Sequence, residues 1–220
     1  MIDLDELERD ALTELLNMGV GRAATYLSRM VSDQVMLSVP AVSIVPREAA
    51  LQALTRNEPA PFVAVAQNFQ GRFSGRALLI FPEVNSLELV RAAVGAGYSL
   101  EEIVDLEQEA LTEMGNVILN GCLSVIANAL KETLNISLPS LLRGDGRALL
   151  YSAGNDDGEA GAASGDALVL LLYIDFSIRS RNIRGYIALL MDLPSLTNLR
   201  ELIHRFITDI ATGADCGDRS

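Results

Sequence analysis

The chain has 220 residues, 50% of them hydrophobic, and it carries 29 acidic against 17 basic side chains, which gives a formal net charge of −12. That apolar content is enough for a folded core and excludes a disordered chain. The negative charge repels phosphate backbones and anionic lipid headgroups, so neither nucleic acid nor a membrane surface is an expected partner.

No segment predicts a membrane span or a secretion signal. The longest apolar run, 167–174, is far shorter than the roughly 18 residues that a membrane helix needs. Residues 1–6 are acidic, whereas a signal peptide begins with basic and then apolar residues. We therefore expect a cytoplasmic protein.

The rare residue types argue against metal and thiol chemistry. The chain has one histidine, His204, and two cysteines, Cys122 and Cys216, which are far apart. A zinc site needs about four such ligands, or three and a water, and a disulfide framework needs more cysteines. We expect no metal site, a core position for Cys122, and a solvated or capping position for His204.

Hydrophobic periodicity predicts the elements of the first hundred residues. Apolar residues at helical spacing predict a long helix over 4–31. A valine-rich strand is predicted over 35–45, where Pro40 indicates an edge or a bulge. The next segments are a short helix at 48–54, a loop at 56–61, a hairpin of 62–69 with 75–81 around 70–72, and a helix at 83–94 that ends at Gly95 and Gly97.

The same order starts again in the second half. Its predicted elements are a long helix at 106–134, a strand at 136–142 containing Pro139, strands at 167–178 and 185–193 that turn near 181–182, and a closing helix at 196–210 after Pro194. Residues 144–165, rich in Gly, Ala, Ser and Asp, are expected to form an inserted loop. A phosphate cradle is the alternative there, and the missing Gly-Lys-Ser/Thr sequence argues against it.

This repetition predicts mixed helix and strand content arranged by internal duplication. We expect a single domain, 1–220, made of two repeats, 1–100 and 101–220, each with the order helix, strand, hairpin, helix. The two copies are expected to pack around a pseudo-twofold axis and to share one sheet.

Residues 19–24, Gly-Val-Gly-Arg-Ala-Ala, match a dinucleotide-binding fingerprint. That fingerprint must follow a strand and open a helix, whereas these residues lie inside a predicted helix. We interpret the glycines as positions where the helix packs closely on a neighbour.

A polar stripe runs along the first long helix. Asp10, Glu14 and Asn17 are spaced by four and then three residues, which places them within about 60° of one another around the helix. Gly21 continues the stripe without a side chain and leaves the surface beside Asn17 open. The opposite, buried side is predicted to hold Leu12, Leu16, Gly19, Ala23 and Met30.

The stripe recurs 99 positions further on, in the second long helix. There the same places, including that of Pro40, are taken by Glu109, Glu113, Asn116 and Pro139. A solvated helix face is the ordinary interpretation of such polar residues. Duplication accounts for the prolines at strand starts, but it does not by itself account for outward-facing residues that are alike in both copies.

The motif of Asp10, Glu14 and Asn17, followed after 22 residues by Pro40, resembles the signature of the CheC/CheX/FliY phosphatases of bacterial chemotaxis. Residues 17–28 resemble CheC in particular, as do residues 113–118. The family has Asp or Ser at the first position, and Glu109 departs from that. The resemblance covers nearly the whole chain, and it implies an α+β fold in which long helices carry the sites on their outer faces against an antiparallel sheet.

The resemblance also implies an activity, the dephosphorylation of the aspartyl phosphate of a CheY-like receiver domain. Asn17 and Asn116 would orient the attacking water, since a carboxamide donates and accepts hydrogen bonds without titrating. Glu14 and Glu113 would pair with the receiver's lysine. The chain would bind no cofactor, because the receiver supplies the Mg²⁺.

Two other functions stay open. Flagellar switch proteins have a middle domain similar to this family, lack the Glu/Asn pair and act as scaffolds. An adaptor for the receptor deamidase CheD is the third candidate, although no residue can be assigned to that contact. The Glu/Asn pairs present in both halves favour the enzyme.

Overall fold

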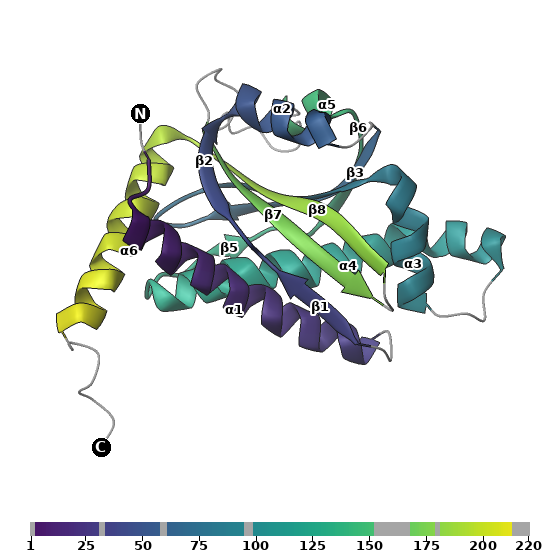
Figure 1. Cartoon of the computed structure of the whole chain (residues 1–220), viewed down its shortest axis with the longest axis horizontal. Helices are drawn as coiled ribbons and strands as arrows, with labels where there is room; N and C mark the ends of the chain where they lie inside the picture. Colours follow the sequence, from purple (N-terminus) through teal and green to yellow (C-terminus); the bar gives the residue numbers. More distant parts are fainter. Residues whose placement is uncertain are drawn as a thin grey trace.

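Figure 1 shows the chain as a computed structural model, which describes residues 3–30, 34–57, 61–94, 99–151, 168–178 and 181–212. The long helices are α1 (Glu6–Met30), α4 (Leu100–Ala129) and α6 (Leu193–Thr212). The shorter helices are α2 (Arg47–Asn57), the 3-10 turn η1 (Glu83–Asn85), α3 (Ser86–Val94) and α5 (Gly146–Tyr151). The strands are β1 (Val35–Ser38), β2 (Val42–Pro46), β3 (Phe62–Gln70), β4 (Gly75–Pro82), β5 (Asn135–Ile136), β6 (Ser140–Gly144), β7 (Leu168–Ile178) and β8 (Arg181–Met191).

The described strands form one sheet of the order β1-β7-β8-β4-β3-β5, in which β2 also pairs with β7 and β6 with β3. Every pairing is antiparallel, as the family resemblance implied. The hairpins β3–β4 and β7–β8 form the centre and meet where Leu78 faces Ala188. Each half of the chain contributes short outer strands to the hairpin of the other half.

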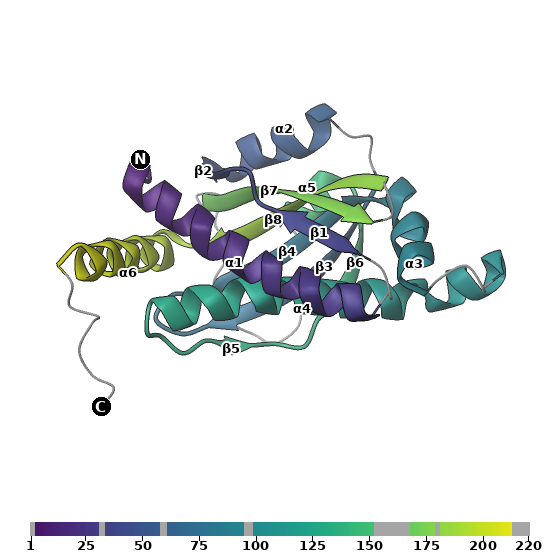
Figure 2. The ribbon, with the colours of Figure 1, turned by 60° about the horizontal axis from the view of Figure 1, so that its bottom comes forward.

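Side chains along the central strands alternate between two hydrophobic cores. One set, which includes Val63, Leu79 and Leu172, faces α1, α4 and α6. The residues that follow or precede them, such as Phe62 and Leu78, face α2 and α5. Figure 2 shows the resulting layers, with α1 and α4 side by side on one side of the sheet and α2 on the other. The predicted α+β class is therefore confirmed.

The two long helices α1 and α4 touch where each has a glycine. A Cβ atom on Gly19 would lie 2.7 Å from the carbonyl oxygen of Gly121, and one on Gly121 would lie 2.8 Å from that of Gly19. Such contacts leave no room for a side chain, so the two backbones approach closely only because both residues are glycine. The close-packing interpretation holds for Gly19. Gly21 has nothing within 4 Å of its Cβ position and lies on the open face.

The two halves have the same order of elements. Helix α1 corresponds to α4, and α2 corresponds to α5. Strands β1 and β2 correspond to β5 and β6, and the hairpin β3–β4 corresponds to the hairpin β7–β8. Exchanging the halves leaves the strand order of the sheet unchanged, which is the arrangement expected around a pseudo-twofold axis. Descent of the two repeats from one duplicated unit stays a prediction.

The structure corrects several predicted boundaries. Helix α4 begins six residues before the predicted 106, because the reciprocal hydrogen bonds of Ser99 and Glu102 cap its start, and it ends at Ala129. The strands predicted over 35–45 and 136–142 are each divided at their proline, which cannot donate a ladder hydrogen bond. The turn predicted near 181–182 falls inside β8.

Helix α5 was not predicted, because its few residues begin with a glycine inside the segment taken for a loop. It packs on α2, where a Cβ atom on Gly146 would lie 2.9 Å from Leu51 Cδ1. The rest of the predicted loop, from residue 152, lies outside the described residues up to 167.

One helix of the described part is long and apolar enough to cross a membrane by length and composition, and it spans Asp105–Ala129. The prediction that no segment has the length and composition of a membrane span therefore missed this helix. The most apolar stretch of this helix is 56% buried inside the fold, against α1 and the sheet. That burial is typical of the core helix of a globular protein.

Candidate functional site

Helix α1 carries the first predicted polar stripe on its outward face. Asp10 and Glu14 are exposed and Asn17 is half-buried, while Leu12 and Leu16 are fully buried on the opposite side. The predicted division of the helix is therefore observed, with one correction. Met30, placed on the buried side by the spacing, is 38% exposed at the last residue of the helix.

The carboxamide of Asn17 is fixed by the backbone just before Pro40. Its Oδ1 accepts a hydrogen bond from the backbone N–H of Val39 at 2.9 Å, and its Nδ2 donates to the carbonyl oxygen of Val39 at 3.1 Å. The N–H can only donate and the carbonyl can only accept, so the amide has one possible orientation. These two bonds explain the spacing of 22 residues that precedes Pro40 in the motif.

Asn17 keeps hydrogen-bonding capacity for a ligand. An amide oxygen has two lone pairs and an amide nitrogen has two hydrogens, and Val39 uses one of each. No other residue in the described part of the chain bonds to this carboxamide. The open surface at Gly21, one turn further along α1, leaves space on that side of Asn17.

Apolar side chains are exposed on the same face of α1. Leu7 is 67% exposed and Met18 is 47% exposed, and they flank Glu14 at seven and four residues. A groove between α1 and β1 begins at Gly21 and includes Thr25 and the exposed Met36. Exposed apolar residues around a carboxylate are typical of a surface that binds another protein.

Helix α4 carries the second predicted stripe, and its asparagine is bonded differently. Glu109 and Glu113 are exposed and Asn116 is half-buried, like their counterparts. Asn116 Oδ1, however, accepts from Gln67 Nε2 at 3.1 Å and from Asn120 Nδ2 at 2.6 Å. The two asparagines therefore have different hydrogen-bond partners, and the water-orienting role of both stays a prediction.

The backbone before Pro139 is also held by a different partner. Gln67 Nε2 donates to the carbonyl oxygen of Ser137 at 3.1 Å, so a β3 side chain binds this backbone, one residue before the position that corresponds to Val39. Leu138, the counterpart of Val39, is 90% exposed, whereas Val39 is 1% exposed. The strand breaks at Pro40 and Pro139 are thus similar, but the side chains that bind the backbone before each proline differ.

Three differences in sequence between the two halves account for the different hydrogen bonds of Asn17 and Asn116. Gly115, on which a Cβ atom would clash with the side chain of Val65, lets α4 approach β3 and brings Asn116 to Gln67. The residue of β7 that corresponds to Gln67 is the buried Ile174, which has no polar group to offer. Asn120 stands 99 residues after the open Gly21 and fills the space beside Asn116.

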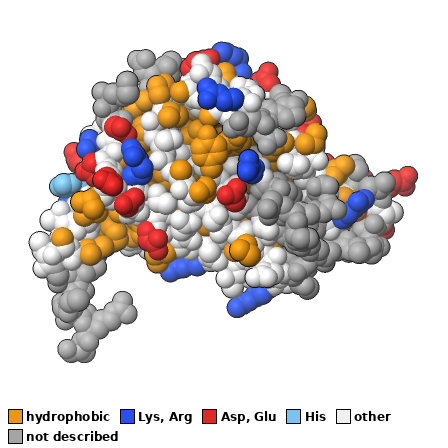
Figure 3. Space-filling view, in the orientation of Figure 1, with side chains coloured by type: hydrophobic (Ala, Val, Ile, Leu, Met, Phe, Trp, Pro, Cys, Tyr) orange, Lys and Arg blue, Asp and Glu red, His pale blue; other side chains and the backbone are white. Residues whose placement is uncertain are grey.

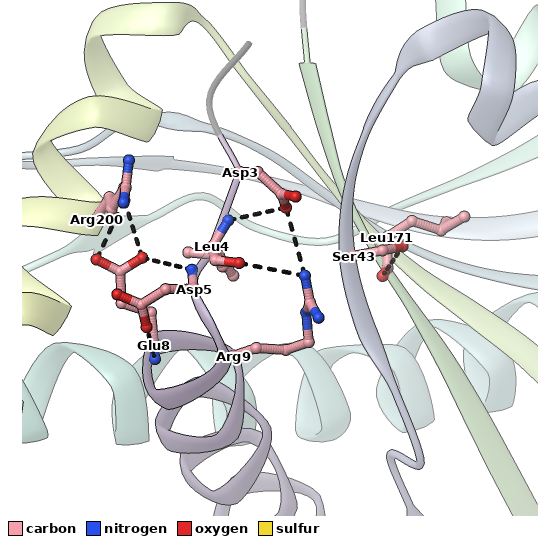
Figure 4. A network of polar contacts seen from close by, with 8 residues as sticks. All are labelled: Asp3, Leu4, Asp5, Glu8, Arg9, Ser43, Leu171 and Arg200. Atoms are coloured by element: carbon pink, nitrogen blue, oxygen red, sulfur yellow. Dashed lines mark hydrogen bonds and ion pairs between the residues drawn. The ribbon is translucent and has the colours of Figure 1, made fainter.

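A pair of buried glutamates was missed by the sequence analysis. Glu8 is 2% exposed and Glu107, 99 residues later, is 8% exposed. Glu8 accepts two bonds from Arg200 Nε, at 2.9 and 3.1 Å, and its backbone N–H and side chain make reciprocal bonds with Asp5 that cap α1 (Figure 4). Their equal spacing from Glu14 and Glu113 was a visible signal, but nothing in the sequence marked these carboxylates as buried.

Glu107 is held by partners from other elements. Ser86 donates to it at 2.5 Å and Arg143 Nη2 donates at 2.8 Å. Burial acts to lower the pKa of Arg143, but its hydrogen bonds to Glu83 and Glu107 outweigh this and raise it above the usual value. Glu8 and Glu107 therefore fix the starting segments of the site helices to α6 and to β6, respectively.

The surface around the first stripe has mixed charge. Figure 3 shows acidic side chains gathered where α1 begins beside α6, with apolar side chains exposed over the strands above them. His204 is 71% exposed on α6 and lies 3.9 Å from Glu8 Oε1, which agrees with its predicted solvated position. No group of three or more His, Cys, Asp or Glu residues that could hold a metal ion occurs in the described part.

The chain is similar in sequence to several known proteins. A model of the CheC-like family matches residues 7–44, the segment that runs from α1 to β2. The flagellar motor switch phosphatase FliY of Bacillus subtilis is 30% identical over 143 residues, which are 62% of this chain and 36% of FliY. The putative CheY-P phosphatase CheC1 of Halobacterium salinarum is 25% identical over 155 residues, 66% of this chain and 73% of that protein.

The crystal structure of Thermotoga maritima FliY has the same fold. It superimposes with a TM-score of 0.68 at 16% identity, covering 95% of this chain and 99% of that one. The chain spans about a third of the length of the B. subtilis relative, at 36%. Together the matches confirm the resemblance to CheC-like proteins that the motif around Asn17 predicted.

Proposed function

We propose that this chain is a phosphatase that removes the aspartyl phosphate of a CheY-like receiver domain, with Asn17 and Glu14 of α1 acting on it. The support from relatives is that one is named a phosphatase and another a putative CheY-P phosphatase. The observation on this chain that carries the proposal is the pair of bonds from Val39 to Asn17. They hold a carboxamide rigidly on an accessible helix face with one donor and one acceptor left over.

Asn17 suits the task of orienting water. A water that donates a hydrogen bond to Oδ1 has its own lone pairs directed away from the protein, toward a phosphorus atom docked against α1. The carboxamide does not titrate, so this geometry persists across the physiological pH range. Because Val39 fixes the amide before the substrate arrives, little reorganisation is needed in the transition state.

Glu14 suits the task of fixing the register of the receiver. Its carboxylate is exposed one turn before Asn17, where a lysine of the partner can reach it. Leu7 and Met18 provide apolar contact area around the charged pair. A charge-assisted contact with apolar surroundings gives both orientation and affinity.

The metal of the reaction belongs to the substrate in this proposal. The receiver supplies Mg²⁺ and a lysine that neutralise the phosphoryl oxygens, and the chain adds the positioned water. EDTA should therefore stop turnover, while the dialysed chain alone should hold no stoichiometric Mg²⁺ or Zn²⁺. A cytoplasmic location, expected from the sequence, is part of the same proposal.

The test is the rate at which a radiolabelled, phosphorylated CheY-like receiver loses phosphate with and without this chain. Acceleration by the chain, and loss of about 10²–10³ of it in Asn17→Ala, is expected. Asn128→Ala, which removes an exposed asparagine near the end of α4, is the matched control and should keep the activity. Asn17→Ala should still bind the receiver activated with beryllofluoride, because the water is not needed for docking.

The second candidate function is a non-catalytic scaffold like those of the flagellar switch, and the same bonds allow it. A carboxamide that bonds twice to Val39 is also a structural tie between α1 and the end of β1. No acceleration by the wild-type chain with any receiver of the source genome would favour the scaffold. In that case Asn17→Ala should only lower the melting temperature. A role as a CheD adaptor stays a prediction.

A further inference from the structure

We propose that the two stripes are not equivalent sites, and that Asn120 and Gln67 keep the α4 stripe inactive so that turnover occurs on α1. This inference rests on the proposed phosphatase function. It concerns the hydrogen-bonding state of Asn116, the residue that the sequence pattern makes the counterpart of Asn17. Asn120 is thereby assigned as a positioning residue that acts through Asn116.

The oxygens of the two asparagines differ in the number of lone pairs that remain free. Asn116 Oδ1 receives hydrogen bonds from Gln67 and from Asn120, so both lone pairs of the oxygen are used. Asn17 Oδ1 receives one, from Val39, and has a lone pair left. Only the α1 asparagine has an acceptor for the hydrogen of an attacking water.

A backbone carbonyl fixes the orientation of the three amides beside α4. The carbonyl oxygen of Ser137 can only accept, so the Gln67 group that faces it must be the nitrogen. Gln67 Nε2 then requires the oxygen of Asn116 on its other side, and this oxygen in turn requires the nitrogen of Asn120. The backbone of Ser137 thus fixes the whole chain of side chains, and Asn116 cannot flip to free its oxygen without losing two bonds.

The amide nitrogen of Asn116 cannot take over the role of its oxygen. The amide nitrogen of Asn116 has hydrogens to donate, but a water that is held only by a donor uses a lone pair to accept that bond. Its hydrogens are then left without a fixed partner, so its remaining lone pair has no fixed direction toward the phosphorus atom. A donor alone therefore cannot replace the acceptor that Asn17 retains.

The side chain of Asn120 also obstructs the α4 stripe sterically. The position beside Asn17 is Gly21, which is open, and the corresponding position beside Asn116 holds the Asn120 side chain at 2.6 Å. A receiver docked on α4 in the same pose would meet that side chain. Substitution of Asn120 by glycine removes the obstruction and also returns one lone pair to Asn116, which then matches the state of Asn17.

The experiment uses the full chain and the receiver phosphatase assay with four variants. Asn17→Ala should fall to nearly the spontaneous rate, whereas Asn116→Ala should keep at least half of the wild-type rate. Asn17→Ala combined with Asn120→Gly should recover at least tenfold over Asn17→Ala alone. Asn17→Ala combined with Ser124→Gly, at an exposed position one turn further along α4, controls for a new glycine in the helix and should recover nothing.

The outcomes separate this inference from the function on which it rests. If Asn116→Ala loses as much activity as Asn17→Ala, or if Asn120→Gly restores nothing in a variant that remains folded by circular dichroism, the inactive state of the α4 stripe is wrong while the phosphatase stands. If the wild-type chain accelerates no receiver, both proposals are overturned. Unequal asparagine variants together with recovery through Asn120→Gly support the inference.

Discussion

The two long helices carry the same motif in different surroundings. On α1 the asparagine bonds to the backbone of Val39 and the next turn is the open Gly21; on α4 it bonds to Gln67 and to Asn120. The spacing of a motif therefore sets which helix face a residue occupies. What the residue can bind is set by neighbours from other strands and from the next turn.

The same comparison extends to the buried ends of the two helices. Glu8 relies on one arginine, Arg200, together with the cap of its own helix. Glu107 has the Ser86 hydroxyl in addition to Arg143, which itself pairs with Glu83. Among the described residues, the Glu8 carboxylate therefore accepts hydrogen bonds from one side chain of another element, and the Glu107 carboxylate accepts them from two.

The largest expected effect follows from the difference between the groups that bind Glu8 and those that bind Glu107. Arg200→Ala leaves the Glu8 carboxylate buried without its cation, which should lower the free energy of unfolding by roughly 3 kcal/mol. Arg143→Ala should lower it by only about 1–2 kcal/mol, because the Glu107 side chain is more exposed than that of Glu8 (11% against 3%) and keeps the Ser86 hydroxyl from another helix. Urea unfolding of the two variants measures both values. Equal losses would contradict the asymmetry of the two helix starts.

The second prediction concerns a variant in which α1 receives an asparagine at the position that corresponds to Asn120 of α4. Gly21→Asn places a carboxamide one turn after Asn17, where it can donate to the free lone pair of Oδ1. Turnover of a phosphorylated receiver should fall about tenfold to a hundredfold, in the range of other lost polar contributions to a transition state. Gly21→Ala fills the same position without a donor and should lose much less. Equal losses in the two variants would show that only space matters there.

The third prediction compares the exposed glutamates. Glu14→Gln should raise the apparent KM about tenfold, the size of one charge-assisted contact, with little change in kcat. Glu113→Gln should change neither value by more than about twofold if receivers dock productively on α1. The Glu14 effect should shrink at high salt, since exposed charges are screened over about 10 Å at 0.1 M. Steady-state kinetics at two salt concentrations distinguish these results, and a larger effect of Glu113→Gln would reverse the assignment.

Much of this architecture could be predicted from local sequence. The long helices, the hairpins and the outward stripe of Asp10, Glu14 and Asn17 follow from periodicity, and the offset of 99 residues indicates how the halves correspond. Helix α5 was missed because it is short and glycine-initiated, although α2 at the corresponding place was predicted.

The bonding of the site could not be predicted, because it depends on contacts between distant segments. Gln67 reaches Asn116 across 49 residues of chain, and its importance appears only when Gly115 lets α4 sit against β3. The contrast between Gly21 and Asn120 was visible at the offset of 99, but its meaning required the bond between Asn120 and Asn116. The burial of Glu8 and Glu107 likewise depends on partners from α6, α3 and β6.

The smallest expected effect concerns the place where the two helices cross. Cys122 lies there, 2% exposed, and burial raises the pKa of its thiol from 9.0 to about 12. With Cys216→Ser as the background, the folded chain should not react with a thiol reagent at pH 8, either alone or with a bound receiver, if α1 and α4 stay together during turnover. Labelling that a receiver accelerates would show that the helices separate.

The same thiol makes the stability of the fold depend on pH with a defined sign. In the unfolded chain it ionises near 9.0 and in the folded chain near 12, so above pH 9 the unfolded state loses its proton first and is favoured. The contribution is constant below pH 9 and is lost progressively as the pH rises toward 12. The stability advantage of the wild-type chain over Cys122→Ala in urea should therefore be smaller at pH 10 than at pH 8. An unchanged advantage would mean that the crossing of α1 and α4 admits solvent to Cys122, and that the two site helices are less firmly joined than the contact between Gly19 and Gly121 indicates.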